Sequence, residues 1–186
     1  MAQGIRLNPL GKILVMKAQY IHYFRPEHIR VIDEAVAISE EIVSDRMGLT
    51  STYWKRNPYE VKTLKETAAD ERPGHAFAHL VRYGKGVKDK SRGSDAPLDF
   101  YRICLHDHRI LTATEKKGLF DLKPFLVYIL SHELLHITRF AGFRCHMDSR
   151  RRGIEEGIVH RLTGTILKSV PLSGLGQVVS YFEAAA

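Results

Sequence analysis

The segment 121–140, DLKPFLVYILSHELLHITRF, constrains the fold of this chain more than any other. Asp121 stands where a helix cap is expected, and Pro124 falls in the first turn, where its missing N–H costs little. Gly142 follows as a stop signal. Apolar residues fill most of the positions between these signals. The segment is therefore predicted to form one buried helix.

This predicted helix carries two histidines four residues apart, His132 and His136, with Glu133 beside the first. Residues four apart project from one helix face, so two imidazoles can share a Zn²⁺ ion at about 2.0–2.1 Å each. Glu133 would lie next to the metal and could take a proton from a water whose pKa zinc lowers toward about 7. Burying two histidines and a glutamate without partners is costly, which favours a metal site over a solvated polar stripe.

A catalytic zinc usually has three protein ligands and a water, so a third ligand is expected. Glu155 and Glu156, at the start of a predicted helix over 153–168, could reach the metal if the two helices form a hairpin. His146, in the connecting stretch, is another candidate. The residues alone do not decide which of Glu155, Glu156 and His146 is the third ligand. The histidine-rich extension of the motif fails, because Arg139 and Gly142 stand where Gly and His would be required.

The motif His132-Glu133-x-x-His136, followed by Glu155-Glu156-Gly157, resembles the gluzincin branch of zincin metallopeptidases, and in size the small single-domain minigluzincins. The resemblance covers about residues 121–165. It implies that Glu156, the Glu before the Gly, is the third ligand. Family members often have an acidic residue four positions later to orient a zinc-bound histidine. This chain has His160 there, and we expect His160 to support a ligand from that position.

The other segments predict an α+β fold. Apolar residues at helical spacing, Pro26 and Gly48 predict a helix over 26–47, and β-branched and aromatic residues predict strands over 75–83 and 98–105. Further expected elements are a loop over 49–58, a short helix or a strand beginning at 59, and a continued or third strand over 108–114. The C-terminal segment can pack as a short helix. The resemblance implies a small twisted sheet packed against the motif helix and the following ligand-bearing helix.

Length and composition bound the remaining possibilities. The 186 residues suit a single domain over 1–186, and 44% hydrophobic residues with 26% charged residues exclude a disordered or collagen-like chain. We expect no membrane span and no secretory signal, and two cysteines suit a cytoplasmic protein. The net charge of +7 and the basic stretch from Arg144 to Arg152 leave nucleic acid as a less favoured partner.

The functional hypothesis is a zinc-dependent metallopeptidase that hydrolyses peptide bonds. It has one Zn²⁺ held by His132, His136 and Glu156, with Glu133 as general base and a peptide or protein as substrate. Two alternatives stay open at this stage. One is a non-catalytic protein that keeps a zincin-like site for a structural metal. The other is a basic protein associated with nucleic acid.

Overall fold

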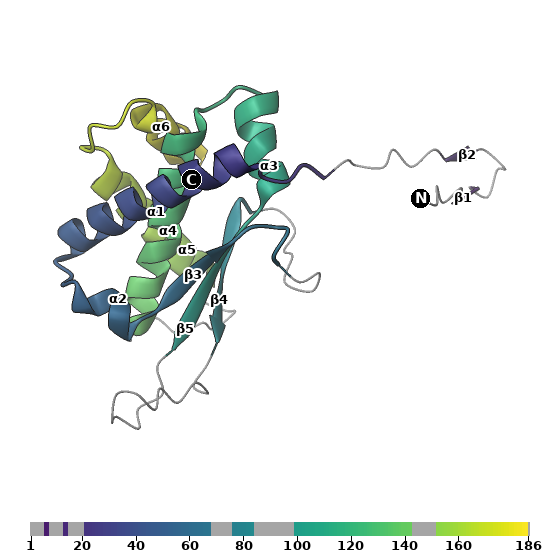
Figure 1. Ribbon diagram of the computed structural model, residues 1–186. Coiled ribbons are helices and arrows are strands. Elements are labelled where there is room, and N and C mark those ends of the chain that lie inside the picture. The colour runs from purple at the N-terminus through teal and green to yellow at the C-terminus, as the bar shows by residue number, and fades with distance from the viewer. Residues whose placement is uncertain are drawn as a thin grey trace.

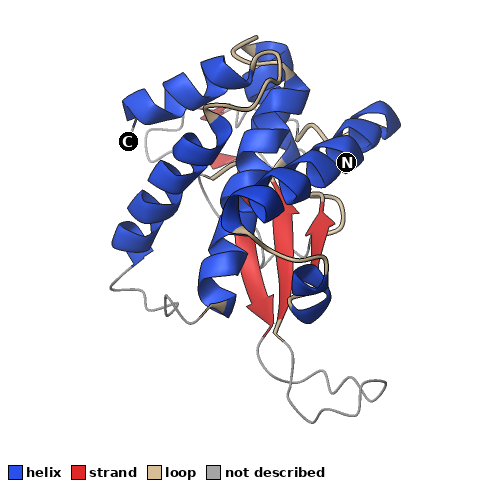
Figure 2. Cartoon of the chain, turned by 90° about the vertical axis from the view of Figure 1, so that its left-hand side faces the viewer, coloured by secondary structure: helices blue, strands red, loops and turns tan. Residues whose placement is uncertain are grey.

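The computed structural model describes residues 6–7, 13–14, 21–67, 76–83, 99–142 and 152–185. These residues form an α+β fold, as the sequence predicts, in which helices gather on one side of a small sheet (Figures 1 and 2). In chain order the elements are β1 (Arg6–Leu7), β2 (Ile13–Leu14), α1 (Pro26–Met47), α2 (Thr52–Arg56), β3 (Tyr59–Lys62), β4 (Ala78–Tyr83), β5 (Phe100–Leu105), α3 (Asp107–Leu111), the π-helical turn η2 (Thr112–Lys116), α4 (Leu122–Ala141), α5 (Arg152–Leu167) and α6 (Leu175–Ala185).

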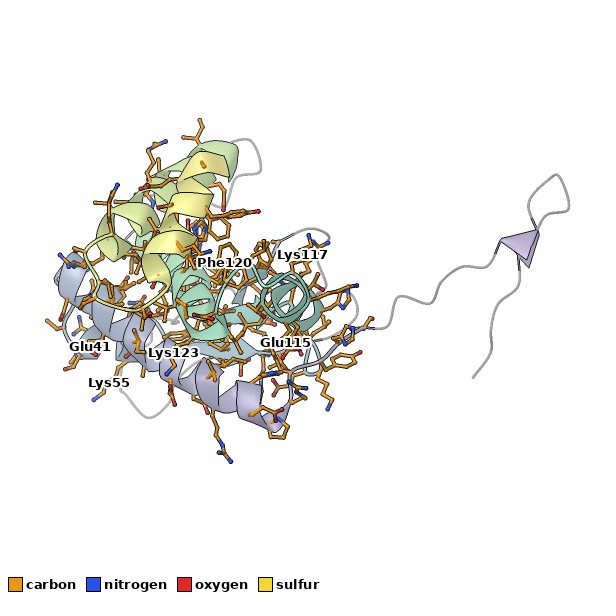
Figure 3. All side chains as sticks on the ribbon, turned by 90° about the horizontal axis from the view of Figure 1, so that it is seen from above. Glu41, Lys55, Glu115, Lys117, Phe120 and Lys123 are labelled. Carbon is orange, nitrogen blue, oxygen red and sulfur yellow. The ribbon has the colours of Figure 1, made fainter. Side chains whose placement is uncertain are left out.

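The central element is α4, the predicted motif helix. Every residue from Pro124 to Thr138 is buried. Seen from above, α4 lies between α1 and α6 (Figure 3), and it also contacts α5, β4 and β5. A helix this enclosed must be apolar on nearly all faces, which explains why its sequence shows little amphipathic contrast. Any polar side chain on it is therefore held in place by its surroundings.

The three-stranded sheet has the order β3-β5-β4, with β3 parallel and β4 antiparallel to β5. Tyr101, Ile103 and Leu105 of β5 are fully buried and belong to the same core as α4. Arg102, between them in the alternation, bonds Glu60 of β3 at 2.6 Å. One face of the sheet is thus apolar and covered by helices, while Arg102 and Glu60 form an ion pair on the other.

The predicted helix over 26–47 is confirmed as α1. Pro26 occupies its first position, and Gly48 ends it with φ +63°, a left-handed conformation that glycine adopts without steric cost. The hydroxyl of Ser39 donates to the carbonyl of Val127 at 3.2 Å and joins α1 to α4. Helix α1 therefore covers one flank of the motif helix.

Two expectations about local structure were wrong. The segment 108–114 is not a strand, because it continues from α3 into η2. The hydroxyls of Thr112 and Thr114 donate to carbonyls four residues back, at 2.6 and 3.0 Å, which reconciles these β-branched residues with a helical backbone. The expected loop over 49–58 contains the short helix α2. A helix or a strand was expected from residue 59 onward, and the structure has a strand there, β3.

The carboxylate of Asp107 joins three distant parts of the chain. It is completely buried at the start of α3 and accepts the backbone N–H of Phe24 at 3.0 Å and of Leu64 at 2.8 Å. Burial raises the pKa of Asp107, and the two backbone bonds partly offset that rise. The segments before α1 and after β3 are therefore fixed to the end of the sheet through one side chain.

Replacing Asp107 with Ala is expected to lower the free energy of unfolding by about 3 kcal/mol, because two buried backbone donors lose their acceptor. Chemical denaturation measures the difference. Asp33→Ala, which removes an exposed carboxylate from α1, should change stability by less than about 0.5 kcal/mol. Equal effects of the two substitutions would contradict the role of Asp107 in holding the two backbone segments.

No helix among the described residues has the length and apolar character needed to cross a membrane. Of the two cysteines, Cys104 is buried and free, and Cys145 lies outside the described residues.

Candidate metal centre

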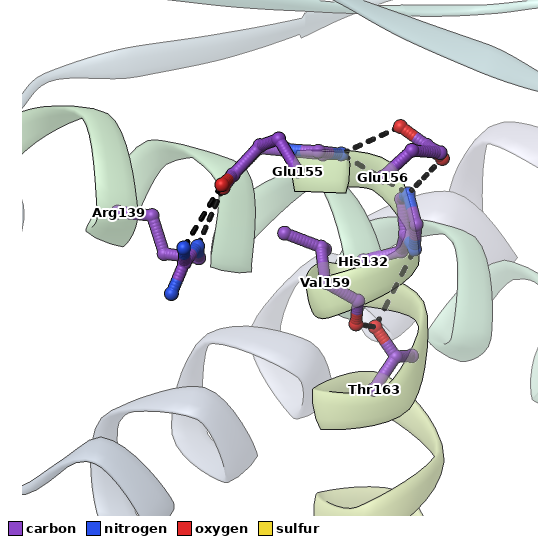
Figure 4. A network of polar contacts seen from close by, with 7 residues as sticks. His132, Arg139, Glu155, Glu156, Val159 and Thr163 are labelled. Carbon is purple, nitrogen blue, oxygen red and sulfur yellow. Dashed lines mark hydrogen bonds and ion pairs between the residues drawn. The ribbon is translucent and has the colours of Figure 1, made fainter. Parts of the chain in front are cut away.

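The structure brings together His132 and His136 of α4 and Glu156 of α5 (Figure 4). The Nε2 atoms of the two histidines are 3.2 Å apart. The Glu156 carboxylate places Oε1 2.9 Å from Nε2 of His132 and Oε2 3.2 Å from Nε2 of His136. Among the described residues these three form a group that could hold a metal ion.

The spacing of these atoms fits a divalent ion. Ligands at about 2.0–2.1 Å from a tetrahedral metal are separated from one another by roughly 3.3 Å. The three contacts of 2.9, 3.2 and 3.2 Å are close to that value. Two imidazoles and a carboxylate also match the nitrogen and oxygen ligands that zinc accepts. The two histidines are buried, whereas the Glu156 side chain is 56% exposed, so the group closes on its solvent side with a carboxylate.

Thr163 orients the ring of His132. Its hydroxyl is fully buried in α5 and donates to the carbonyl of Val159 at 2.8 Å. The same oxygen lies 3.4 Å from Nδ1 of His132. A hydroxyl that gives its one proton to a carbonyl can only accept from the ring, so Nδ1 of His132 carries the proton. Nε2 is then the nitrogen of His132 that faces Glu156, and a bound metal would take the place of its proton.

The neighbouring acids Glu155 and Glu156 do different things. Glu155 is buried and pairs with Arg139 of α4, with Oε2 2.9 Å from one guanidinium nitrogen and Oε1 in contact with another (Figure 4). Glu156, one residue later, points to the histidines. Glu155, the alternative third ligand, therefore does not belong to the ligand group, because its carboxylate pairs with Arg139.

Glu133 lies in a cavity of about 150 Å³ beside the ligand group. His132, Glu156 and His160 contribute the other polar walls, and Tyr128 and Phe182 are among the apolar walls. Three residues at the start of β4, Ala76, Phe77 and Ala78, also line the cavity. The ligand group thus lies beside a partly open cavity lined by the Glu133 carboxylate and the start of the edge strand β4.

Burial and charge shift the pKa values of these groups in different directions. Burial raises the pKa of Glu133, and the two histidines offset part of the rise. Burial alone would lower the pKa of His132, but the hydrogen bond to Glu156 and the nearby carboxylates outweigh it and raise the value. The hydrogen bonds from His132 and His136 hold the pKa of Glu156 far below its usual range. Glu156 is therefore an anion, suited to bind either a proton-bearing histidine or a cation.

His160 lies beside the ligand group. Among the described residues it makes no hydrogen bond to a ring nitrogen of His132 or His136. Its ring packs edge-on against His132 with centroids 5.7 Å apart, and its Nε2 donates to the carbonyl of Phe182 at 3.3 Å. The expected support of His132 comes from Thr163 instead. The remaining candidate ligand, His146, and the basic stretch before Arg152 lie outside the described residues.

Sequence reasoning missed Thr163. The signal was available, because Thr163 is seven residues after Glu156 and thus two turns along the same helix face. The sequence could not show that this face turns toward Nδ1 of His132 rather than toward solvent.

Comparisons of the chain with models of protein families, with curated proteins and with solved structures give no match.

Substitutions of the two adjacent glutamates are expected to have opposite effects on metal binding and stability. Glu156→Gln should weaken zinc binding at least about 100-fold, because a charged ligand becomes neutral. Glu155→Gln should leave zinc binding nearly unchanged and lower the free energy of unfolding by about 3 kcal/mol, because the ion pair between Arg139 and a buried carboxylate is lost. Competition titration with a chelator and denaturation of the metal-free proteins separate the two quantities. Weak zinc binding by both variants would contradict the assignment of Glu156 as the ligand and Glu155 as the partner of Arg139.

Replacing Thr163 with Val keeps the side-chain shape and removes the hydroxyl behind His132. Zinc affinity should fall about tenfold, since the ring loses the contact that fixes its proton on Nδ1. Thr165→Val is the matched control, because Thr165 makes the same bond to a carbonyl four residues back but is exposed. The same loss of affinity in both variants would mean that helix stability, and not the orientation of His132, is responsible.

Proposed function

We propose that this protein is a zinc-dependent peptide hydrolase with a zincin-like fold of the gluzincin type. The observation that carries the proposal is the convergence of His132, His136 and Glu156 beside a cavity that also holds Glu133. The spacing of the motif and the choice of Glu156 agree with the resemblance in sequence.

His132, His136 and Glu156 would hold the ion, and Thr163 would keep Nε2 of His132 available to it. Bound zinc supplies Lewis acidity for the scissile carbonyl and the attacking water. The carboxylate of Glu133 would take a proton from the attacking water and pass it to the amine that leaves when the peptide bond breaks. The apolar walls from Tyr128 and Phe182 limit the access of bulk water to this space.

The sheet supports a peptide as the substrate. The start of β4 lines the cavity, and β4 pairs with β5 along one edge only among the described strands. An extended peptide can add to a free strand edge through backbone hydrogen bonds. We therefore propose that substrate lies along β4, with its scissile bond next to Glu133.

A structural metal site remains the alternative function. It requires a fourth protein ligand, and among the described residues the group has three members, with Glu133 and the cavity on the remaining side. Three protein ligands and an open position are typical of catalytic zinc. The alternative of nucleic-acid binding rests on residues outside those described, so no observation in the structure favours it.

The test is the Glu133→Gln variant, assayed with a mixture of internally quenched peptides. Zinc content should stay at one ion per chain, and turnover should fall roughly 10³-fold, because the proton acceptor is lost while the ligands are kept. Glu34→Gln, which changes an exposed carboxylate of α1, is the control and should retain full turnover.

Turnover of Glu133→Gln near that of the unmodified protein would refute the mechanism. Zinc binding without any turnover in the unmodified protein, with four protein ligands found by X-ray absorption, would favour the structural site.

A further inference from the structure

His106 fixes the backbone at the start of β4. It is buried and lies between the end of β5 and the start of α3. Its backbone N–H donates to the carbonyl of Phe77 at 2.9 Å, and its ring makes a hydrogen bond to the backbone of Ala76. One residue thus holds two consecutive residues, both of which line the cavity beside the ligand group.

The ring of His106 has one favoured tautomer. Its Nε2 lies 3.3 Å from Nδ1 of His79, which leaves Nδ1 for the bond to Ala76. That bond by itself raises the pKa of the ring, as a ring N–H that donates to a carbonyl does. Burial, together with the nearby His79 and Arg109, outweighs it and lowers the pKa of His106 to about 4. At neutral pH the ring is therefore uncharged, with its proton on Nδ1 and with Nε2 accepting from His79.

The bond between His106 and Phe77 also determines which backbone groups of β4 face its free edge. The two residues continue the register in which Ala78 lies opposite Leu105. Successive residues of an antiparallel strand bond their partner strand alternately, so the N–H and C=O of Ala78 point away from β5. Among the described strands β4 has no partner on that edge. A peptide that adds to β4 beside the cavity therefore pairs with Ala78, the residue next to the two that His106 holds.

The same backbone bond holds one wall of the cavity. The ring of Phe77 packs edge-on against Phe125 of α4 and Phe182 of α6, with centroid distances of 4.9 and 6.2 Å. Phe77 and Phe182 line the cavity together with Glu133. A shift of the first residues of β4 would therefore move both the strand edge and an aromatic wall relative to Glu133.

We propose that His106 is a positioning residue of the proposed peptidase, which holds Ala76 and Phe77 so that the edge of β4 receives the substrate backbone in register with Glu133. The inference rests on the proposed function. His106 does not line the cavity, so its effect reaches the substrate through β4. Loss of its ring is therefore expected to weaken substrate binding and to leave the chemical step at the ligand group largely unchanged.

Two amide substitutions separate the roles of the two ring nitrogens. The amide nitrogen of Asn takes the place of Nδ1, and that of Gln takes the place of Nε2. His106→Gln should raise KM for internally quenched peptides about three- to tenfold and leave kcat within about twofold, because Ala76 loses its donor. His106→Asn keeps the donor and should return KM to within about twofold of the unmodified protein. Zinc content should be the same in both variants and in the unmodified protein.

His108→Gln is the matched control. His108 lies two residues away, accepts the backbone N–H of His22 at 3.3 Å and does not line the cavity beside the ligand group. Its substitution should leave KM unchanged. A second readout needs no activity: the ¹⁵N signals of the His106 ring should show a proton on Nδ1 alone at neutral pH, since the pKa of the ring is about 4.

Binding of peptides to zinc-loaded Glu133→Gln protein connects the effect to the substrate backbone. The peptides carry an N-methyl group on one peptide bond at a time, and fluorescence anisotropy measures their affinity. At one position the methyl group should weaken binding about tenfold, because it removes a backbone donor from the pairing with β4. When His106→Gln is added, the same methyl group should weaken binding only about two- to threefold, because the pairing is already disturbed.

The outcomes separate the two proposals. The inference about His106 is overturned by a rise in KM that His106→Asn does not reverse, by a fall in kcat at unchanged KM, by a ring proton on Nε2, or by equal losses on N-methylation with and without His106→Gln. Cleavage of no peptide refutes the proposed function, and N-methyl-sensitive binding that responds to His106→Gln would then still support the positioning role. Absence of peptide binding to the Glu133→Gln protein overturns both.

Discussion

The enclosure of α4 is the constraint on which the rest of the structure depends. From Pro124 to Thr138 this helix is buried by α1, α5, α6 and the sheet. A polar group in such a place must find partners, because stranding it costs several kcal/mol. His132 meets Thr163 and Glu156, and His136 meets Glu156 through Nε2. The elements around α4 thus fill its apolar flanks and supply partners for Nε2 of both histidines and for Nδ1 of His132, whereas Nδ1 of His136 and the hydroxyl of Ser131 have no hydrogen-bond partner among the described residues.

Much of this arrangement can be predicted from local sequence signals. Pro26, Gly48, Asp121 and Gly142 mark the ends of α1 and α4 within one residue. Helix periodicity and capping depend on residues close in the chain, so the sequence contains the relevant information. The motif histidines are likewise related by one helical turn, and their convergence follows from helix geometry alone.

The parts that could not be predicted depend on contacts between distant segments. The parallel pairing of β3 with β5 joins residues about forty positions apart, and nothing near Tyr59 announces the partner. The segment 108–114 follows Asp107, whose carboxylate accepts the backbone N–H groups of Phe24 and Leu64, and the sequence near 108–114 shows neither contact. The residues alone did not decide between Glu155 and Glu156, the resemblance favoured Glu156, and the pairing of Arg139 with Glu155 separates them in the structure. Tertiary context thus decided each of these cases over local propensity.

The pairing of Arg139 with Glu155 also bears on how α4 and α5 are connected. The two residues are sixteen positions apart and join the end of one helix to the start of the next, beside the ligand group (Figure 4). Together with the contact between Thr163 and His132, they fix the relative position of the two helices without help from the covalent link. Chain length between α4 and α5 then adds only a slowly growing loop-closure entropy. A relative with a longer chain between the two helices should therefore retain the same metal geometry, as long as the counterparts of Arg139, Glu155 and Thr163 are kept.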